Sequence, residues 1–242
     1  MKNSIRKKIV NYIRDQVKSS GAKGVVLGLS GGIDSSLVCA LSKEAVGRKK
    51  VLGVFLPCNS EDKDLKDAKL VASKLGILTK TVDLSAIYKN LIKILPAANK
   101  LARSNIKPRL RMMVLYYFAN KLNYLVSGTG NKSELSVGYF TKYGDGGVDI
   151  LPIAGLLKKQ VRVLAEELGV PKHIINKPPT AGLWQGQTDE GEMGITYLEL
   201  DSILECLDKK KKQIVASDKV KRVKMMIGKS EHKRQGPKIC CI

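Results

Sequence analysis

Residues 24–45 read GVVLGLSGGIDSSLVCALSKEA, and their pattern decides the fold of the chain. The run VVLGL (25–29) is short and apolar and contains β-branched residues, which predicts a buried strand. The apolar residues after the polar SGGIDSS loop (30–36) recur every three or four positions, which predicts a helix over 35–46. We therefore expect a strand, a tight loop and a helix in succession, as in the first half of a βαβ unit.

Strand and helix patterns alternate along the rest of the chain. Further strands are predicted at 50–57, 79–84 and 123–128, and helices at 1–17, 60–76, 84–95, 108–122 and 158–169. Ser60 is the expected N-cap of the helix that ends at Gly76. The alternation predicts an α/β fold with a Rossmann-like, doubly wound and mostly parallel sheet and flanking helices. No linker rich in proline, glycine or serine divides the sequence, so we expect residues 1–242 to form one domain.

The chain is strongly basic, with a formal net charge of +21 over 242 residues. Such a balance raises the question of a polyanionic ligand, nucleic acid first of all. The lysines are dispersed, however, and the densest run, Lys209 to Lys212, has no interleaved aromatic residues on which bases would stack. We therefore expect solvated lysine-rich surfaces, and neither nucleic acid nor membrane as a partner. The chain has no apolar run of transmembrane length and no signal-peptide core near its start, which predicts a cytoplasmic protein.

None of the five cysteines stands in C-x-x-C spacing. This argues against a zinc ribbon, an iron–sulfur site and a redox dithiol. Cys39 lies on the apolar side of the helix predicted after the SGGIDSS loop, so we expect it in the core. Free thiols are typical of a reducing compartment.

Three polar loops follow predicted strands: LSGGIDSS (29–36), LPCNSED (56–62) and SGTGNKSE (127–134). In an open parallel sheet, ligands bind beyond the carboxyl ends of the strands. Adjacent glycines at a strand-to-helix turn let backbone N–H groups approach an anion, and the positive end of the next helix favours phosphate. The SGGIDSS loop has neither the Walker A lysine nor the G-x-G-x-x-G spacing. Its pattern indicates a phosphate-binding loop; the alternative is a helix N-cap cluster whose glycines are incidental.

Asp34 is unusual inside a loop that would bind an anion. Its carboxylate would repel a phosphate unless a cation lay between them, so it predicts Mg²⁺ as a cofactor. Glu134 opens the helix after SGTGNKSE, where it can face Asp34 across the edge of the sheet. Two converging carboxylates predict a magnesium site on a bound phosphate. The alternative for Glu134 is an acidic first-turn residue that only complements the helix dipole.

The SGGIDSS loop resembles the pyrophosphate loop of the ATP-pyrophosphatase (N-type) superfamily, which cleaves ATP between its α- and β-phosphates and adenylates a substrate. Four later stretches resemble the NAD synthetase family within it: NIKPRLRMMVLYYFAN (105–120), GTGNKSELSVGYFTKYGDGGVDILPIAGLLKKQVRVLA (128–165), PPTAGLWQGQTDEGEMG (178–194) and SEHKR (230–234). The resemblance covers most of the chain from residue 24 to 234. It implies the adenine-nucleotide α-hydrolase type of Rossmann-like fold.

The resemblance also implies roles for individual residues. ATP would be bound by Gly28, Leu29, Ser30, Gly31, Gly32, Ile33, Asp34, Ser35, Thr129, Lys158 and Thr180. Deamido-NAD would be bound by Arg109, Lys142, Asp149, His232 and Lys233. Asp34, Lys142 and Lys158 would take part in catalysis, and Asp34 and Glu134 would hold the metal. Taken singly, Arg109, Lys142 and Lys158 could instead be solvated surface charges, and SEHKRQGPK could be a basic tail.

The implied reaction has two steps and needs no protein nucleophile. The nicotinate carboxylate of deamido-NAD attacks the α-phosphate of ATP and releases pyrophosphate, and ammonia then displaces AMP to give NAD. Only one helix is predicted before the first strand, so we expect no glutamine amidotransferase domain and free ammonia as the donor, unless a separate subunit supplies it. The long polar loop over 177–194 is expected to be a functional lid or disordered.

The resemblance further implies a homodimer with the dinucleotide site at the subunit interface. The RMMVLYYFAN stretch is apolar on more than one face, which suits a helix packed against both a core and a partner; the alternative is a fully buried helix. Two other functions remain open on the residues alone. A tRNA-modifying enzyme of the superfamily would suit the charge, and a nucleotide-binding regulator without catalysis would need the loop but not Asp34 paired with Glu134.

Overall fold

The computed structural model describes residues 2–209 and 217–240, and a parallel four-stranded sheet lies at its centre. The strands are β1 (Gly24–Gly28), β2 (Val51–Phe55), β3 (Leu78–Thr81) and β4 (Tyr124–Val126). They lie in the order β3-β2-β1-β4, and every pair is parallel. Because the chain leaves β1 toward β2 on one side and reaches β4 on the other, the order reverses beside β1. The predicted doubly wound α/β fold is confirmed.

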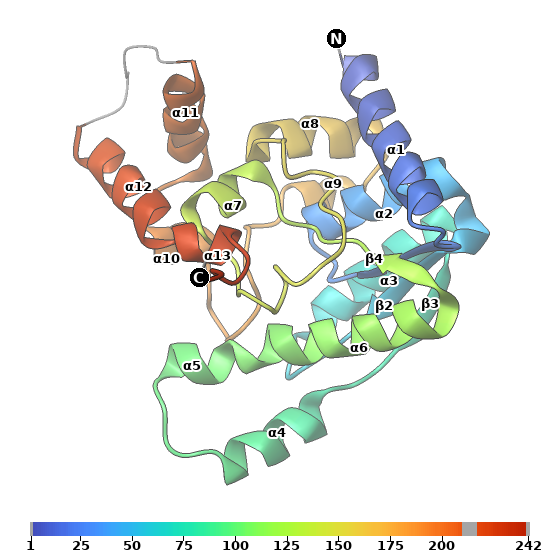
Figure 1. Ribbon diagram of the computed structural model, residues 1–242, viewed down its shortest axis with the longest axis horizontal. Helices are drawn as coiled ribbons and strands as arrows, with labels where there is room; N and C mark the ends of the chain where they lie inside the picture. Colours follow the sequence, from blue (N-terminus) through green and yellow to red (C-terminus); the bar gives the residue numbers. More distant parts are fainter. Residues whose placement is uncertain (1, 210–216, 241–242) are drawn as a thin grey trace.

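Helices cover both faces of this sheet (Figure 1). The helices are α1 (Lys2–Ser19), α2 (Ile33–Val46), α3 (Asp62–Leu75), α4 (Ser85–Ile94), α5 (Lys100–Ser104), α6 (Ile106–Leu122), α7 (Lys132–Val137), α8 (Lys158–Glu167), α9 (Lys172–Ile175), α10 (Asp189–Met193), α11 (Tyr197–Asp208), α12 (Ser217–Lys229) and α13 (Glu231–Arg234); Arg48–Lys50 forms a 3₁₀ turn. Alternate strand residues separate the two sides: Val25 and Leu27 pack with α1, α2, α3 and α8, whereas Val26 and Val54 pack with α4 and α6.

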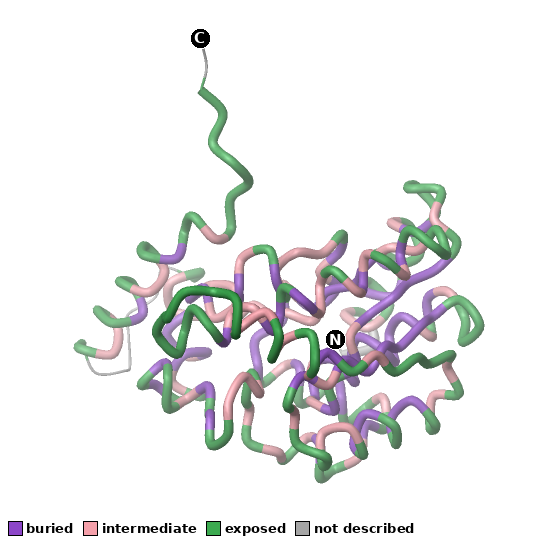
Figure 2. The backbone as a smooth tube through the Cα atoms, turned by 90° about the horizontal axis from the view of Figure 1, so that it is seen from below, coloured by how far each residue is buried: buried purple, intermediate pink, exposed green. Residues whose placement is uncertain are grey.

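A third apolar cluster lies away from the sheet, where α7, α11 and α12 pack together. Its fully buried members include Leu200, Ile203 and Val223. The chain then ends in an exposed segment over 235–240 that extends from the body of the molecule (Figure 2). The α7–α11–α12 unit therefore forms a wall beside the carboxyl end of the sheet.

Most predicted elements agree with the structure to within a few residues, with one correction. Ser60 does not cap the helix after β2: Glu61 is the N-cap residue of α3, without a side-chain cap bond. The Ser60 hydroxyl instead accepts a hydrogen bond from the Cys58 amide at 3.2 Å and one from Arg111 at 3.4 Å. As predicted, α3 ends at Gly76, which has the left-handed conformation with φ of 62°.

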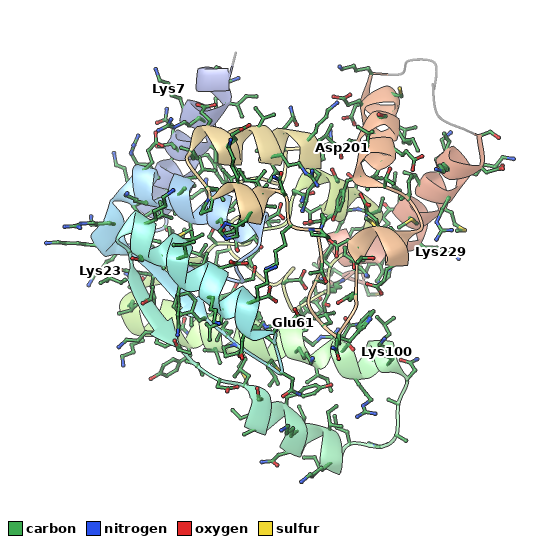
Figure 3. All side chains as sticks on the ribbon, turned by 180° about the vertical axis from the view of Figure 1, so that it is seen from behind. Lys7, Lys23, Glu61, Lys100, Asp201 and Lys229 are labelled. Atoms are coloured by element: carbon green, nitrogen blue, oxygen red, sulfur yellow. The ribbon has the colours of Figure 1, made fainter. Side chains whose placement is uncertain are left out.

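Burial and charge also bear on the sequence-based expectations. Cys39 is fully buried, as predicted, and burial raises the pKa of its thiol to about 12. Lys7, Lys23 and Lys229 lie on well-separated parts of the surface, in line with dispersed rather than clustered charge (Figure 3). Most of the Lys209 to Lys212 run lies outside the described residues. No helix in the described ranges combines the length and apolarity needed to cross a membrane.

Candidate active site

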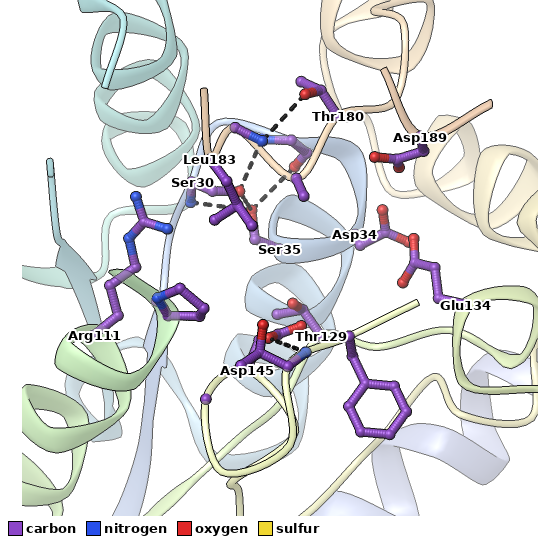
Figure 4. A pocket seen from close by; sticks show the side chains of 18 of the residues that line it. Ser30, Asp34, Ser35, Arg111, Thr129, Glu134, Asp145, Thr180, Leu183 and Asp189 are labelled. Atoms are coloured by element: carbon purple, nitrogen blue, oxygen red, sulfur yellow. Dashed lines mark hydrogen bonds between the residues drawn. The ribbon is translucent and has the colours of Figure 1, made fainter. Parts of the chain in front are cut away.

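A cavity of about 550 Å³ opens beyond the carboxyl ends of β1, β2 and β4. Its walls come from the SGGIDSS loop, the start of α6, the loops around 128–134 and 138–148, and the loop over 177–187. Ser30, Asp34, Thr129, Glu134 and Thr180 all face into it from different elements (Figure 4). The sequence predicted a ligand site beyond the carboxyl ends of the parallel strands, and this cavity lies there. It is therefore the candidate site.

The SGGIDSS loop is held in one conformation by its glycines and serines. Gly31 has φ of 80°, and a Cβ there would lie 2.3 Å from the backbone oxygen of Asp64, so no other residue fits. The Ser35 hydroxyl accepts a hydrogen bond from the Ser30 amide at 3.2 Å and lies 3.0 Å from the Ser30 hydroxyl. It also donates to the carbonyl of Gly32 at 3.1 Å. These hydrogen bonds fix the conformation of the turn, and none of them is a side-chain cap of α2.

The N-terminus of α2 is therefore available to a ligand. Gly32 is its N-cap residue and makes no side-chain cap bond, so the first amides of a 14-residue helix lack a capping side chain at the cavity wall. These amides and the positive end of the helix dipole favour an anion. The loop has the chemistry expected of a phosphate-binding turn.

Lys158 brings the two predicted metal ligands together. Its ammonium lies 2.6 Å from Asp34 Oδ2 and 3.1 Å from Glu134 Oε1, and its side chain is only 3% exposed. Burial alone would lower the pKa of Lys158, but the two carboxylates outweigh it and raise that pKa above its ordinary value. Burial raises the pKa of Glu134 to about 7, although Lys158 acts in the opposite direction. Asp34 and Glu134 thus converge on one cation.

Further polar residues, which the sequence did not single out, position this group. Asn131 is fully buried, and its side-chain amide donates to Asp34 Oδ1 at 2.9 Å. Its side-chain oxygen, Oδ1, accepts from the Glu134 backbone amide in a capping box. The Tyr197 hydroxyl donates to Glu134 at 3.2 Å or to Asp189 at 3.0 Å. Asn131 could have been found from the N-x-x-E capping signature. Tyr197 lies 63 residues from Glu134 in sequence and gave no local signal.

Asp201 joins the two helices that carry Glu134 and Lys158. One of its oxygens accepts from the Ser133 hydroxyl of α7 at 2.5 Å, and the other accepts from the Lys159 amide of α8 at 2.9 Å. The Lys158 amide in turn donates to Ser133 at 3.0 Å. Asp201 is 2% exposed, so α11 holds the starts of α7 and α8 in register through a buried carboxylate.

The residues present fit a divalent cation. Mg²⁺ is typically held by one or two carboxylates together with substrate phosphates, and Asp34 and Glu134 supply two beside the phosphate-binding turn. A neighbouring carboxylate oxygen, Asp189 Oδ1, is buried without a hydrogen-bond partner in the described structure. No cluster of three or more His, Cys, Asp or Glu suited to a metal occurs within residues 2–209 and 217–240. The donor set therefore matches a cation shared with a ligand, not one enclosed by protein.

The structure gathers the predicted ATP-binding residues around this cavity. Those that line it are Gly28, Leu29, Ser30, Gly32, Ile33, Asp34, Ser35, Thr129, Lys158 and Thr180. Gly31 lies behind the turn, packed against α3. Thr180 lies on the 177–187 loop, where its hydroxyl accepts from the Gly182 amide at 3.1 Å.

The residues predicted to bind deamido-NAD lie mainly elsewhere. Arg109 lines a second, apolar cavity of about 520 Å³ between α4 and α6, and it donates to the Lys142 carbonyl at 3.3 Å. The Lys142 ammonium donates to the carbonyls of His232 and Gln235 at 2.5 and 2.9 Å, so these residues form one chain of contacts. The two cavities share one lining residue, Met112.

Asp149 and Lys233 already have protein partners. Asp149 accepts from the Tyr116 hydroxyl at 2.9 Å and from the Val126 amide at 2.8 Å. The Lys233 ammonium donates to the carbonyls of Gly138 and Phe140 at 2.8 and 3.0 Å, and Lys233 lines the first cavity. These contacts tie α13 to the 138–142 loop. The basic SEHKR segment is therefore docked on the body of the protein.

Two more cations beside the first cavity were not predicted as site residues. Arg111 lines the cavity, where its guanidinium donates to the Leu56 carbonyl at 3.1 Å. Lys107, one turn earlier on α6, is 6% exposed and donates to the Leu183 carbonyl at 2.6 Å. Both stand in the NIKPRLRM stretch, whose other basic residue, Arg109, is the one predicted to bind deamido-NAD. Their burial depends on how α6 rotates against the sheet, which its sequence pattern does not fix.

Known proteins match this chain over nearly its whole length. A family model described as NAD synthase matches residues 5–237. The NH(3)-dependent NAD(+) synthetase of Archaeoglobus fulgidus is 48% identical over 234 residues, which cover 96% of this chain and 94% of that protein. Among solved structures, NMN synthetase from Francisella tularensis superposes with a TM-score of 0.92 at 37% identity, covering 100% of this chain and 99% of that one. NH3-dependent NAD synthetase from Campylobacter jejuni gives a TM-score of 0.86 at 30% identity, covering 99% of both chains.

The matches agree with the geometry of the site. The matched range contains the SGGIDSS turn, both carboxylates that converge on Lys158, and the loop that carries Thr180. The relatives, the fold and the residues that line the cavity all point to the same protein family. The chain belongs to the NAD synthase family.

Proposed function

We propose that this chain is an ammonia-dependent NAD synthetase, a ligase that uses ATP to convert the nicotinate carboxylate of deamido-NAD into the amide of NAD. One observation carries the proposal: Asp34 and Glu134 converge on Lys158 beside a phosphate-binding turn. The names of the relatives point to the same activity. Residues 1–242 would act as one synthetase domain.

ATP would lie with its phosphates against the SGGIDSS turn. The amides at the start of α2 and the hydroxyl of Ser30 supply hydrogen-bond donors there, while Ser35 holds the turn in place. Thr129 and Thr180 face the same cavity from opposite walls, where they can contact the rest of the nucleotide (Figure 4). Such a site neutralises and orients phosphate groups, and phosphoryl and adenylyl transfer depend mostly on these two effects.

In the first step, a carboxylate oxygen of deamido-NAD attacks the α-phosphorus of ATP. A new P–O bond forms, the bond between the α-phosphorus and its bridging oxygen breaks, and pyrophosphate leaves. Lys158 lines the same cavity as the SGGIDSS turn, so its ammonium is placed to meet the negative charge of the phosphates. Asp34 and Glu134 would hold Mg²⁺, which when bound supplies positive charge against the phosphate oxygens.

In the second step, ammonia attacks the carbonyl carbon of the acyl adenylate. The C–N bond forms, the C–O bond to AMP breaks, and a proton is lost from nitrogen. Adenylation is needed because the oxygen of a free carboxylate is a poor leaving group. No covalent enzyme intermediate is required, which fits a cavity wall built from cations, amides and carboxylates.

The dinucleotide would reach the reaction from the second cavity. Arg109 and the Lys142 backbone meet there, and Met112 separates that cavity from the ATP site. The outer faces of α4 and α6 expose Ile94, Met113 and Tyr117, which are 78%, 57% and 60% accessible. Exposed apolar patches of this kind are typical of protein interfaces. We propose that a second copy of the chain covers this face, and that the acceptor site lies at the resulting homodimer interface.

The buried free thiols Cys39 and Cys58 support a reducing compartment. The proposal accordingly places the enzyme in the cytoplasm.

A second acceptor deserves a direct comparison because the Francisella tularensis protein carries the name NMN synthetase and superposes over the whole chain. Nicotinate mononucleotide has the same carboxylate as deamido-NAD and lacks its adenylate half. Adenylation of that carboxylate, followed by attack of ammonia and release of AMP, would then give NMN. The exposed cavity around Arg109 supports the larger acceptor, since it offers room beyond the ATP site.

The experiment supplies purified protein with ATP, Mg²⁺, ammonium and either acceptor. We expect NAD, AMP and pyrophosphate in equal amounts, and a higher kcat/KM for deamido-NAD than for the mononucleotide. ADP in place of AMP, or the absence of any amide product, would contradict the proposed chemistry. A higher kcat/KM for the mononucleotide would replace deamido-NAD as the acceptor while leaving the mechanism in place.

A further inference from the structure

The loop over 178–188 forms one wall of the ATP cavity and contains the only tryptophan of the chain, Trp184. Within the loop, the Leu183 amide donates to Gln187 Oε1 at 2.7 Å, and Gln187 donates to Glu192 at 2.6 Å. The loop is therefore closed on itself. Its position over the cavity depends on its contacts with residues of other elements.

At its base, the loop is tied to α3. The Lys177 ammonium lies 2.5 Å from Asp64 Oδ1 and 2.9 Å from Asp67 Oδ2. Asp64 is also the residue whose backbone oxygen crowds Gly31 in the phosphate-binding turn. The base of the loop and the turn therefore rest on the same helix.

At its tip, the loop is held by two lysines from the opposite wall. Lys107 of α6 donates from its buried ammonium to the Leu183 carbonyl at 2.6 Å, and Lys100 of α5 lies 4.2 Å from the centre of the Trp184 ring. The Lys107 ammonium also lies 5.2 Å from the centre of the Tyr88 ring. The two loop residues that these lysines contact, Leu183 and Trp184, are adjacent in sequence, and both line the cavity.

Lys107 is an unusual residue to bury. Within the described residues no carboxylate pairs with its ammonium, and the Leu183 carbonyl accepts its hydrogen bond. A buried ammonium without a counter-ion is costly, and burial accordingly lowers its pKa. The hydrogen bond to Leu183 compensates for the lost hydration of Lys107 only while the loop lies over the cavity. The burial of Lys107 and this position of the loop therefore depend on each other.

We propose that Lys107 is a positioning residue that pins the 178–188 loop over the ATP cavity, with Lys100 as a second, exposed contact on Trp184. The loop carries Thr180 into the cavity, so the pin sets where Thr180 meets the nucleotide. That last consequence rests on the proposed function. The contacts that Lys107 and Lys100 make with the loop do not rest on it, because both join protein groups only.

Because Trp184 is the only tryptophan, its fluorescence reports on this loop alone. Lys107→Met keeps most of the aliphatic stem and removes the ammonium, and Lys107→Arg keeps a charged donor. Lys121→Met is the matched control, since Lys121 lies on the same helix but contacts Tyr117, away from the loop. Acrylamide quenching of Trp184 is measured in each protein without substrate, and circular dichroism melting checks the fold.

We expect quenching by acrylamide to rise about twofold in Lys107→Met as the tip of the loop is released, and to return toward the original value in Lys107→Arg. The KM for ATP should rise about tenfold in Lys107→Met, as for the loss of one charge-assisted hydrogen bond, with a smaller change in kcat. Lys121→Met should leave both quantities unchanged.

Unchanged quenching in a folded Lys107→Met protein would overturn the proposal, whatever the activity. If that variant does not fold, the exposed Lys100→Met takes its place. Increased quenching in Lys100→Met would support the loop contact, and unchanged quenching would overturn it. Failure of the synthetase assay with the unaltered protein would instead contradict the proposed function, so the two results are separable.

Discussion

At the scale of single residues, the site depends on three charged groups whose positions fix one another. Lys158 is buried because Asp34 and Glu134 surround it, and the two carboxylates can lie close together because Lys158 neutralises part of their repulsion. Asn131 links Asp34 to the start of α7, so the carboxylates from two loops share one frame. A change at Asp34 should therefore alter the charge of the site more than its architecture.

Asp34→Asn tests this prediction. Asparagine keeps the size of the side chain, and Lys158 retains Glu134 at 3.1 Å, so the fold should survive. We expect turnover to fall by about 10²–10³, because the cation that would neutralise the reacting phosphates loses one of its two carboxylates. The free energy of unfolding should fall by about 1–2 kcal/mol. The control is Asp208→Asn, which removes an exposed carboxylate that pairs with Lys132. Full activity of Asp34→Asn over a range of Mg²⁺ concentrations would contradict the role of this carboxylate.

At the scale of elements, the loops at the strand ends are positioned by helices distant in sequence. Asp67 of α3 is 7% exposed and contacts Lys177 at 2.9 Å and His173 at 3.1 Å, which joins α3 to α9 and to the base of the 178–188 loop. Burial would raise the pKa of Asp67, but the hydrogen bonds from Lys177 and His173 outweigh it and lower that pKa. The ionised carboxylate therefore stabilises the fold.

The sign of the pH dependence follows from this lowered pKa. In the unfolded chain Asp67 takes up a proton near its ordinary pKa of 3.8, and in the folded protein it does so only at lower pH. The stabilisation is thus complete above about pH 5 and is lost as the pH falls through the folded-state pKa. Asp67→Asn should lower the free energy of unfolding by about 2 kcal/mol at pH 7, and the difference should shrink toward pH 3. Urea titrations at both pH values measure it. An equal difference at pH 7 and pH 3 would rule out the ion pair as its source.

The strand–loop–helix unit and the parallel sheet could be predicted because their signals are local. The apolar run of β1, the glycines of the turn and the spacing of α2 all lie within one stretch of sequence. Ser60 was assigned wrongly as a cap because its hydroxyl is bonded to Cys58 and Arg111. Arg111 lies 51 residues away from Ser60 in the sequence, so no local pattern predicts their contact. Lys107 was overlooked for a related reason: lysine is seldom buried, and only the tertiary packing of α6 reveals it.

At the scale of the whole molecule, an apolar face on α4 and α6 remains exposed. Leu110, Leu115 and Ala119 bury one side of α6 in the core, whereas Met113 and Tyr117 point outward. The helix is thus apolar on two sides, as the sequence predicted, and the second side borders the cavity around Arg109. A second copy packed on this face would also enclose the proposed acceptor site.

Tyr117→Glu tests this arrangement by placing a charge on the proposed interface. We expect the unaltered protein to sediment as a dimer and the variant as a monomer, because desolvating the carboxylate opposes association. Activity should fall when the dimer is lost, since Arg109 lies beside the same face. Leu198→Glu is the control, because Leu198 is 75% exposed on α11, far from this face in the sequence and the fold. A dimeric Tyr117→Glu protein with normal kinetics would place the interface elsewhere.

In the proposed mechanism the acceptor carboxylate attacks the α-phosphorus of ATP, and Asp34, Glu134 and Lys158 control the charge around the phosphates. Deamido-NAD labelled with oxygen-18 in its nicotinate carboxylate tests this most directly. A carboxylate oxygen becomes the bridge of the acyl adenylate and leaves with AMP when ammonia attacks the carbonyl carbon. Mass spectrometry of the products should therefore find the label in the phosphate of AMP and none in pyrophosphate. AMP without label, formed together with NAD, would show that the carboxylate is activated in another way and would contradict the account.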